Sequence, residues 1–363
     1  MSRLAKAIRG LRDFRASLTQ PGERALFGII DFSYQHYALG DALTSLVDMS
    51  TVALDSGVKA IDLVLVLDPD RPSAGPQGFI TPHNYTTYLD NLFPAYLCSP
   101  MVRSIRVLRE RPTFNHLLLS AKQSGMPIWP GMLEHLHARF TFPFGHQRLN
   151  RFFQAHGYLP MLAAPRGYER WADQFLAKYL SGRFVVCTNL RNSALTPSPA
   201  VTYRDAPLEE WYAFFREIER KYPEVVFFML GSFAEQEHRL SEHPNVISLR
   251  ALGFGLAHEL ALLYRSDLFI GSSSGFASAA MFSALPYVIL NTEHFFAEFA
   301  EVPVHSPHYP FAADNQILVW RREDADLLLG LFEQLYRQSR AAQSSMREAF
   351  GRVRQGETVT MFP

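Results

Sequence analysis

The residues best suited to chemistry form a turn of small residues at positions 271–275, with the sequence Gly-Ser-Ser-Ser-Gly. The turn follows a run at 267–270 that predicts a strand and precedes a run at 276–284 that predicts a helix. Small side chains leave the backbone accessible, and the first N–H groups of a helix have no partner within it, so a phosphate dianion can bind there. The same composition is also typical of a simple helix cap. The residues that we expect to contact the anion are Ser272, Ser273, Ser274 and Gly275.

Two arginines lie where they can reach such an anion. Arg191 comes just after a predicted strand at 184–189, and Arg204 comes just before a predicted helix at 208–221. A guanidinium group can donate two parallel hydrogen bonds to a pyrophosphate. Either arginine could instead pair with an acidic side chain of that helix on the surface.

A second turn of small residues, Gly231 and Ser232, follows the predicted strand at 225–230. In open parallel sheets, ligands bind beyond the carboxyl ends of the strands. We therefore expect this turn to lie on the same edge of the sheet as the turn at 271–275.

In the N-terminal half, the candidate for chemistry is the pair Gly40 and Asp41. The two residues open a predicted helix at 42–54, after a loop at 33–39 that is rich in aromatic and polar side chains. A carboxylate at this point could act as a general base and remove the proton of a hydroxyl group. Aspartate is also a common capping residue, so a purely structural role for Asp41 stays open.

The order of the predicted elements places these residues in two α/β domains. From residue 183 onward, strands alternate with helices at the rhythm of a parallel sheet built from βαβ units. The length of 363 residues is enough for two domains. The predicted segments are a basic amphipathic segment at 1–22, an N-terminal domain at 23–181, a C-terminal domain at 182–322, and a helix that packs back on the protein with a mobile tail at 323–363.

The composition excludes several classes of protein. Hydrophobic residues make up 48% of the chain, which rules out global disorder. Lys plus Arg and Asp plus Glu are 35 each, so no overall field favours nucleic acid, and we expect no nucleic-acid partner. The two cysteines, Cys98 and Cys187, fit neither a zinc pattern nor a disulfide framework. They indicate a reducing compartment, which we expect to be the cytoplasm.

The sequence contains no apolar run of about 18 residues that could span a bilayer, and its N-terminal segment lacks the apolar stretch of a signal peptide. That segment instead interleaves basic side chains with Leu4, Ile8, Leu11 and Leu18 at helical spacing. Such a helix can rest on the cytoplasmic face of the inner membrane, or it can pack on the domain as a solvated helix. The basic residues that would face the inner leaflet are Arg3, Lys6, Arg9, Arg12 and Arg15.

The C-terminal half resembles the donor domain of the ADP-heptose:lipopolysaccharide heptosyltransferases and related glycosyltransferases of the GT-B type. The resemblance rests on residues 245–252 (NVISLRAL) and 259–275 (ELALLYRSDLFIGSSSG), and it continues to Pro286. The order of strand, helix, small-residue turn, helix and proline is the same.

Weaker similarity to that family lies upstream. Arg204 matches a basic residue that precedes a helix in the family, and Gly231 with Glu235 matches a glycine-rich turn followed by an acid. Gly40 and Asp41 match the Gly-Asp pair at the family's first helix.

The resemblance implies an α/β protein with the GT-B fold, in which two Rossmann-like domains with parallel sheets face a cleft. It implies transfer of a sugar from a nucleotide-diphosphate donor in the C-terminal domain to a hydroxyl of a glycan or glycolipid acceptor on the N-terminal side. By this resemblance, Asp41 is the catalytic base, Arg204 is a ligand of the donor phosphates, and Ser274 with Gly275 forms the phosphate-binding turn. It further implies inversion at the sugar, no metal and no cofactor beyond the donor, in bacterial surface glycan or related glycoconjugate synthesis.

The chain also departs from that family. Ser273 replaces an aspartate and Ser278 replaces a histidine, so the donor sugar is open. The loop before Gly40 is longer than in the family, and it could form an acceptor pocket with His36 and Tyr37. Glu293 and His294, after the last predicted strand, could touch the donor sugar. These departures leave two alternatives: a nucleotide-sugar 2-epimerase, and a catalytically silent GT-B protein that acts in binding or as a scaffold.

Overall fold

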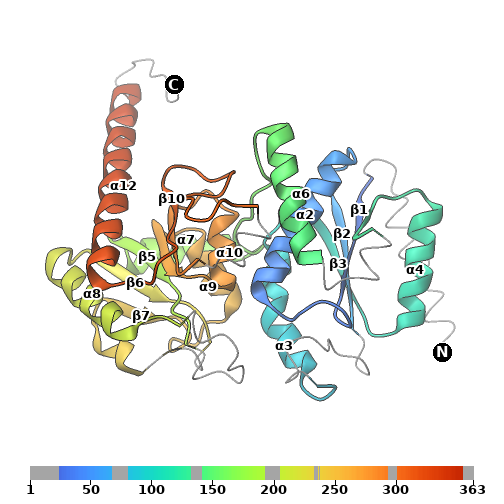
Figure 1. Ribbon diagram of the computed structural model, residues 1–363, viewed down its shortest axis with the longest axis horizontal. Helices are drawn as coiled ribbons and strands as arrows, with labels where there is room; N and C mark the ends of the chain where they lie inside the picture. Colours follow the sequence, from blue (N-terminus) through green and yellow to red (C-terminus); the bar gives the residue numbers. More distant parts are fainter. Residues whose placement is uncertain are drawn as a thin grey trace.

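The computed structural model describes residues 24–67, 81–131, 141–192, 205–232, 236, 238–292 and 301–354. Figure 1 shows two lobes side by side, each built around a parallel sheet. Helix α2 (Leu39–Asp55) of the N-terminal lobe contacts helix α10 (Gly275–Met281) of the C-terminal lobe. The junction between the lobes is therefore formed by the N-terminal parts of the two segments singled out from the sequence.

The N-terminal lobe has a four-stranded sheet in the order β3-β2-β1-β4. Every residue of β1 and β2 is buried, as is expected of parallel strands covered on both faces. The strands are β1 (Leu26–Asp31), β2 (Ile61–Val66), β3 (Val102–Leu108) and β4 (Ile128–Trp129). Besides α2, the helices are α3 (Tyr85–Leu92), the 3₁₀ helix η1 (Phe93–Leu97), α4 (Arg111–Gln123) and α6 (Thr141–His156).

The C-terminal lobe has a six-stranded parallel sheet in the order β10-β9-β8-β5-β6-β7, which is the order of a doubly wound nucleotide-binding fold. The strands are β5 (Phe184–Thr188), β6 (Val225–Met229), β7 (Val246–Ser248), β8 (Leu268–Ser272), β9 (Tyr287–Leu290) and β10 (Gln316–Leu318). Besides α10, the helices are α7 (Glu169–Tyr179), α8 (Leu208–Lys221), η6 (His238–Glu242), α9 (Leu256–Leu263) and α12 (Ala325–Arg354). Helix α12 packs on α8 and then extends beyond the lobe (Figure 1).

Each sheet reverses its strand order at one point, between β1 and β4 in the N-terminal lobe and between β5 and β8 in the C-terminal lobe. At such a point the connections leave the sheet in opposite directions, and the crevice at the carboxyl ends of the strands binds ligands. The loop with His36, which leads into Asp41 of α2, follows β1, and the turn at 273–275 follows β8. Both sets of sequence-predicted residues therefore lie at these points of reversal.

The two lobes share one apolar core. Leu43 and Leu46 of α2 belong to the same buried cluster as Phe276 and Ala280 of α10. The segment that connects the lobes adds backbone bonds to both, since the amide of Leu162 donates to Phe282 O at 2.8 Å and the amide of Ala163 donates to Cys98 O at 2.9 Å. The lobes are thus joined by packing as well as by the chain.

Several elements differ from the expected bounds. Helix α2 begins at Leu39, with Ala38 as its N-cap residue, so Gly40 and Asp41 lie inside its first turn and do not open it. Strand β8 continues to Ser272 because the residues expected to form the start of the turn are paired with β9. The helices α3 and η1 and the short strands β4 and β10 were not predicted. Across the part of the chain that the structure describes, no helix has the length and apolar character needed to cross a bilayer.

Candidate active site at the junction of the two lobes

The turn after β8 uses part of its backbone to hold the sheet together. The amide of Ser272 donates to Asn189 O and the amide of Ser273 donates to Leu290 O, both at 3.0 Å. These two amides are therefore occupied, and an anion cannot take them without breaking a sheet bond. The expected backbone contact with an anion therefore falls on Ser274 and Gly275, and not on Ser272 and Ser273.

The next three amides of this turn are the ones left for an anion. Ser274 is the N-cap residue of α10, and its hydroxyl accepts from the amide of Ala277 at 3.4 Å. Within the described residues, the amides of Ser274, Gly275 and Phe276 have no hydrogen-bond partner. They precede the first closed turn of the helix, where the backbone carries a partial positive charge.

The glycines of the turn are explained by packing between protein segments. A Cβ atom at Gly271 would lie 2.8 Å from Asn189 O, so this glycine allows β5 and β8 to approach. A Cβ atom at Gly275 would lie 2.7 Å from the Cβ atom of Leu39 and 3.1 Å from the amide nitrogen of Gly40. Gly275 is therefore required where the two lobes meet.

The same contact continues on the side of the N-terminal lobe. A Cβ atom at Gly40 would lie 3.2 Å from Oγ of Ser278 and 3.6 Å from Cα of Gly275. Asp41, the predicted base, is the next residue. The structure thus brings Gly40, the residue before Asp41, against the Gly275 turn, although Asp41 and Gly275 are 234 positions apart in the sequence.

Asp41 has a close polar neighbour in the loop before its helix. Nδ1 of His36 lies 3.3 Å from Oδ2 of Asp41, and the two side chains are 31% and 32% exposed. Both groups can therefore reach solvent or a substrate. The pKa of Tyr96, a fully buried residue of η1, is raised mainly by burial and further by the charge of Asp41.

The loop that carries His36 is fastened at its base. Asp31, at the end of β1, is 1% exposed and accepts two hydrogen bonds from the guanidinium of Arg111, which also donates to the hydroxyl of Ser33 at 2.5 Å. Tyr37 stacks on Phe32 with the ring centroids 4.2 Å apart. Burial raises the pKa of Tyr37, so this side chain stays a neutral hydroxyl at physiological pH.

Arg191 lies beyond the carboxyl end of β5, next to the strand that ends in the Gly275 turn. Its Nε atom is buried and has no hydrogen-bond partner among the described residues, and the same is true of Oγ of Ser272. A buried cationic donor without a partner is costly, and an anion at this edge of the sheet would satisfy it.

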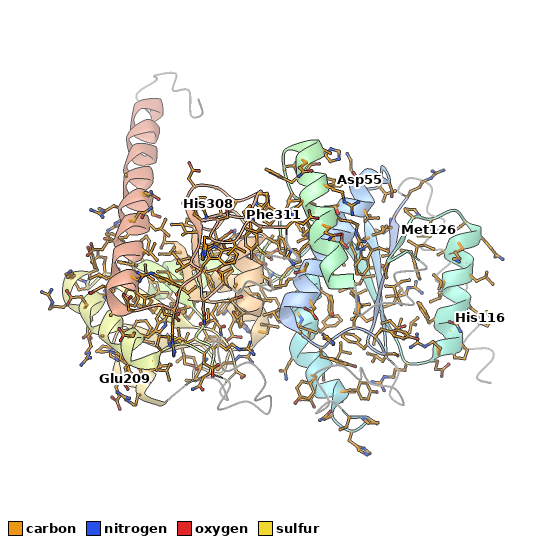
Figure 2. The ribbon with its side chains drawn as sticks, in the orientation of Figure 1. Asp55, His116, Met126, Glu209, His308 and Phe311 are labelled. Atoms are coloured by element: carbon orange, nitrogen blue, oxygen red, sulfur yellow. The ribbon has the colours of Figure 1, made fainter. Side chains whose placement is uncertain are left out.

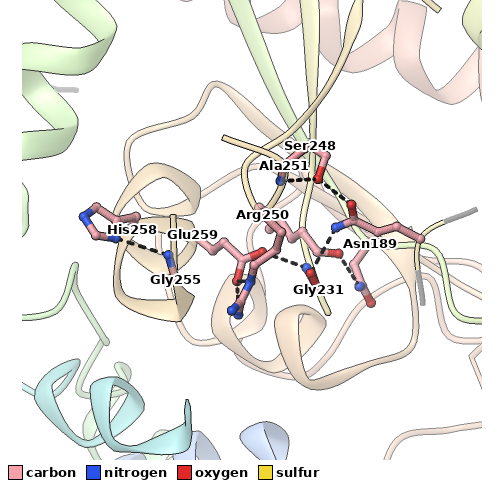
Figure 3. A network of polar contacts seen from close by, with 10 residues as sticks. Asn189, Gly231, Ser248, Arg250, Ala251, Gly255, His258 and Glu259 are labelled. Carbon is pink, nitrogen blue, oxygen red and sulfur yellow. Dashed lines mark hydrogen bonds and ion pairs between the residues drawn. The ribbon is translucent and has the colours of Figure 1, made fainter. Parts of the chain in front are cut away.

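A buried carboxylate supports the second turn, at Gly231 and Ser232 (Figure 3). Glu259 of α9 is 0% exposed. Its Oε1 accepts from the amide of Gly231 at 2.9 Å, and its Oε2 accepts from Nη2 of Arg250 at 2.7 Å. Gly231 has a φ angle of 117°, which favours glycine, so the carboxylate holds a turn that other residues would strain.

Two amide side chains hold the same turn from other directions. Asn189, after β5, donates to Leu230 O at 2.8 Å, and Gln236 donates to Gly231 O at 3.0 Å (Figure 3). This network was not predicted from the sequence. A signal was present, because Glu259 is a charged residue inside the apolar run of α9.

Of the remaining predicted residues, two follow β6 of the C-terminal sheet, and the others cannot be placed. Gly231 is buried and Ser232 is exposed at the end of β6. Arg204, Glu235, Glu293, His294 and the basic residues of the N-terminal segment lie outside the described residues.

The described residues contain no group of three or more His, Cys, Asp or Glu side chains that could hold a metal ion. His308 lies in the segment before β10 (Figure 2). Its Nδ1 is 2.8 Å from Gln316 O, so the ring has a structural partner.

No protein-family model matches the sequence, and the comparison with curated proteins gives no match. The structure, in contrast, is similar to solved glycosyltransferases. Against ADP-heptose lipopolysaccharide heptosyltransferase II from E. coli, the TM-score is 0.53 at 12% identity, with 87% of this chain and 99% of that chain covered. Against a glycosyl transferase of family 9 from Veillonella parvula, the TM-score is 0.51 at 12% identity, with coverage of 86% and 97%. The chain therefore has the two-lobed α/β GT-B fold of these proteins, and the predicted resemblance is confirmed at the level of the fold.

Proposed function

We propose that this protein is a glycosyltransferase that moves a sugar from a nucleotide-diphosphate donor to a hydroxyl acceptor at the junction of its two lobes. The fold supports this proposal, since both similar structures are glycosyltransferases. The observation that carries it is the close approach of Gly40, the residue before Asp41, to the Gly275 turn across the junction. A candidate base and a candidate anion site from different lobes meet there.

In this proposal the C-terminal lobe binds the donor diphosphate. The buried Nε of Arg191 and the unpartnered amides of Ser274 to Phe276 would meet the negative charge that develops on the leaving diphosphate. Arg204 would add a second guanidinium. We propose that these groups act in place of a metal ion, and that a single displacement inverts the configuration at the sugar.

The N-terminal lobe would bind the acceptor. Asp41 and its neighbour His36 are accessible and supply the basic group that removes the acceptor proton. His36 and Tyr37 lie in the loop that follows β1, so a glycan or glycolipid acceptor would bind over this loop.

We further propose that the enzyme works in bacterial surface glycan or related glycoconjugate synthesis, at the cytoplasmic face of the inner membrane. Support comes from the sequence, in which Arg3, Lys6, Arg9, Arg12 and Arg15 alternate with apolar residues at helical spacing. Sedimentation with vesicles that contain anionic lipid tests this point. We expect the protein to bind these vesicles. We expect no binding to neutral vesicles, and none after removal of residues 1–22.

A screen of nucleotide sugars tests the function. The purified protein is heated with ADP, GDP and UDP and with their sugar conjugates, because a ligand that binds only the folded state raises the melting temperature. Release of nucleoside diphosphate is then measured with and without bacterial glycan extracts. We expect a stabilising donor and release that depends on the acceptor.

Other outcomes of the screen contradict the proposal in distinct ways. A donor converted to an epimer without acceptor indicates a 2-epimerase. Stabilisation without turnover over the whole panel indicates a silent binding protein. If no nucleotide stabilises the protein, the proposal of a donor site is wrong.

A further inference from the structure

The interaction of His36 with Asp41 offers a more specific assignment of the base. Nδ1 of His36 faces Oδ2 of Asp41 at 3.3 Å, and about a third of each side chain is exposed. An imidazole that donates its Nδ1–H to a carboxylate keeps Nε2, on the other side of the ring, as a proton acceptor. The carboxylate then fixes both the tautomer and the orientation of the ring.

The structure around the pair keeps this arrangement in place. Asp41 is held in the first turn of α2, where a carboxylate interacts favourably with the helix dipole. The loop with His36 is fastened by the Arg111–Asp31 ion pair at its base and by the stacking of Tyr37 on Phe32. The groups on the adjacent elements are the hydroxyls of Tyr37 and Tyr96, both kept neutral because burial raises their pKa.

We propose that Nε2 of His36 is the atom that takes the proton of the acceptor hydroxyl, and that Asp41 is the positioning residue that orients His36 and stabilises its charged form. The assignment rests on the proposed glycosyl transfer. It differs from the expectation drawn from the heptosyltransferase resemblance, in which the carboxylate itself takes the proton.

The acceptor oxygen forms a bond to the anomeric carbon while the bond from that carbon to the donor phosphate breaks, and its electron pair leaves with the nucleoside diphosphate. The acceptor proton passes to Nε2 of His36, and the imidazolium is paired with the carboxylate of Asp41. His36 then releases the proton to solvent, and the net products are the glycoside, the nucleoside diphosphate and one proton.

A merely structural role predicts different behaviour, and the chain contains a matched control for it. At the other end of α2, Nε2 of His156 lies 3.0 Å from Oδ1 of Asp55, with both side chains more exposed (Figure 2 labels Asp55). This second pair also joins a histidine to α2, but it lies 14 residues from Asp41 along the helix. Variants of His156 therefore measure the effect of losing a helix-end ion pair alone.

The first experiment needs no substrate. The protein is labelled with ¹⁵N-histidine, and the ring nitrogens of His36 are assigned by comparison with His36→Gln. We expect the neutral Nδ1–H tautomer in the wild type and a loss of this preference in Asp41→Asn, with His156 unchanged. An Nε2–H tautomer of His36, or a tautomer that does not respond to Asp41→Asn, overturns the assignment.

The second experiment measures transfer with the donor identified by the nucleotide-sugar screen. We expect His36→Ala to lower kcat by about 10²- to 10⁴-fold, the usual contribution of a general base. The rise in melting temperature on addition of ADP or GDP should be kept, and added imidazole should restore part of the rate. His156→Ala should leave kcat unchanged.

Asp41→Asn should lower kcat without rescue by imidazole, and the double variant should be no slower than the slower single variant, because the two residues act as a unit. If His36→Ala keeps most of kcat while Asp41→Asn abolishes it, the carboxylate is the base and the assignment is wrong. A wild type that transfers no sugar from any donor contradicts the proposed function, whereas the tautomer still reports on the pair.

Discussion

The two lobes differ in the segment that lies where the strand order of each sheet reverses. After β1, the chain enters a loop and leaves His36 and Asp41 about a third exposed. After β8, the chain turns at once into α10, and the amides of Ser272 and Ser273 stay bonded to neighbouring strands. The N-terminal lobe therefore offers side chains that can exchange protons, and the C-terminal lobe offers a fixed backbone that can hold an anion.

Both lobes contain buried carboxylates paired with arginines, and two of these, one from each lobe, can be compared. Asp48, in the N-terminal lobe, accepts from Nε1 of Trp129 at 2.7 Å and from Nε of Arg148 at 2.8 Å. Glu259, in the C-terminal lobe, accepts from the amide of Gly231 and from Arg250. Only the second carboxylate holds a turn at the ligand edge of the sheet.

The largest expected effect comes from Glu259→Gln. Removal of the carboxylate leaves Arg250 without its buried partner, and we expect the free energy of unfolding to fall by about 3 kcal/mol. Because the amide of Gly231 loses its charged acceptor, the rise in melting temperature with ADP or GDP should shrink as well. Urea unfolding and thermal shift measure the two effects.

Asp48→Asn is the matched control for this variant. It should also destabilise the protein, but the response to the nucleotide should be that of the wild type, since Asp48 holds α6 and β4 and not the donor turn. An equal loss of nucleotide response in both variants would show that general destabilisation explains the result.

A smaller effect is expected from Arg191→Ala. A hydrogen bond from a guanidinium to a phosphate contributes about 1.5–3 kcal/mol, so the Kd for a nucleoside diphosphate should rise by about tenfold or more. Isothermal titration with the nucleotide that stabilises the wild type measures this change. Arg183→Ala is the control, because Arg183 precedes the same strand and donates to Pro223 O at 2.6 Å. Unchanged affinity in Arg191→Ala would place the phosphates elsewhere.

The smallest effect is expected from Gly275→Ala. The added methyl group would meet Leu39 and the backbone of Gly40, and such overpacking costs about 1–2 kcal/mol of stability. Transfer should slow because the lobes are pushed apart at the junction. Gly330→Ala, in α12, has no atom within 4 Å of the new methyl group and should raise stability by about 0.5–1 kcal/mol. If both variants change the stability in the same direction, the close contact of Gly275 with α2 is not important for stability.

Most of the C-terminal fold was predictable because buried strands alternate with helices along this half of the chain. Helix α8 was predicted at 208–221 and lies at Leu208–Lys221, with an apolar face of the expected spacing. In the N-terminal lobe, β4 has two residues, which is too short for any periodicity to show. Helix α3 has a weakly apolar sequence, so no local pattern distinguished it from the Pro- and Gly-containing segment that precedes it in the sequence.

The site was only partly predictable because much of it depends on contacts between distant segments. The sequence indicated the turn at 271–275. It did not indicate that Gly271 allows the end of β5 to approach, or that Gly275 allows the start of α2 to approach. Nor could it show that Glu259 lies beneath Gly231, since the two residues are 28 positions apart. Local spacing carries information on helices and strands, whereas burial of a charge becomes visible only when the sheet is assembled.

The apolar core common to both lobes also governs how the protein melts. Because Leu46 and Phe276 belong to one buried cluster, loss of packing in either lobe removes buried contacts from the other. Calorimetry should then record a single cooperative transition, as for one folding unit. A nucleotide held by residues of the C-terminal lobe would protect the N-terminal lobe as well, so hydrogen exchange of α2 should slow when the donor is bound at the far side of the junction.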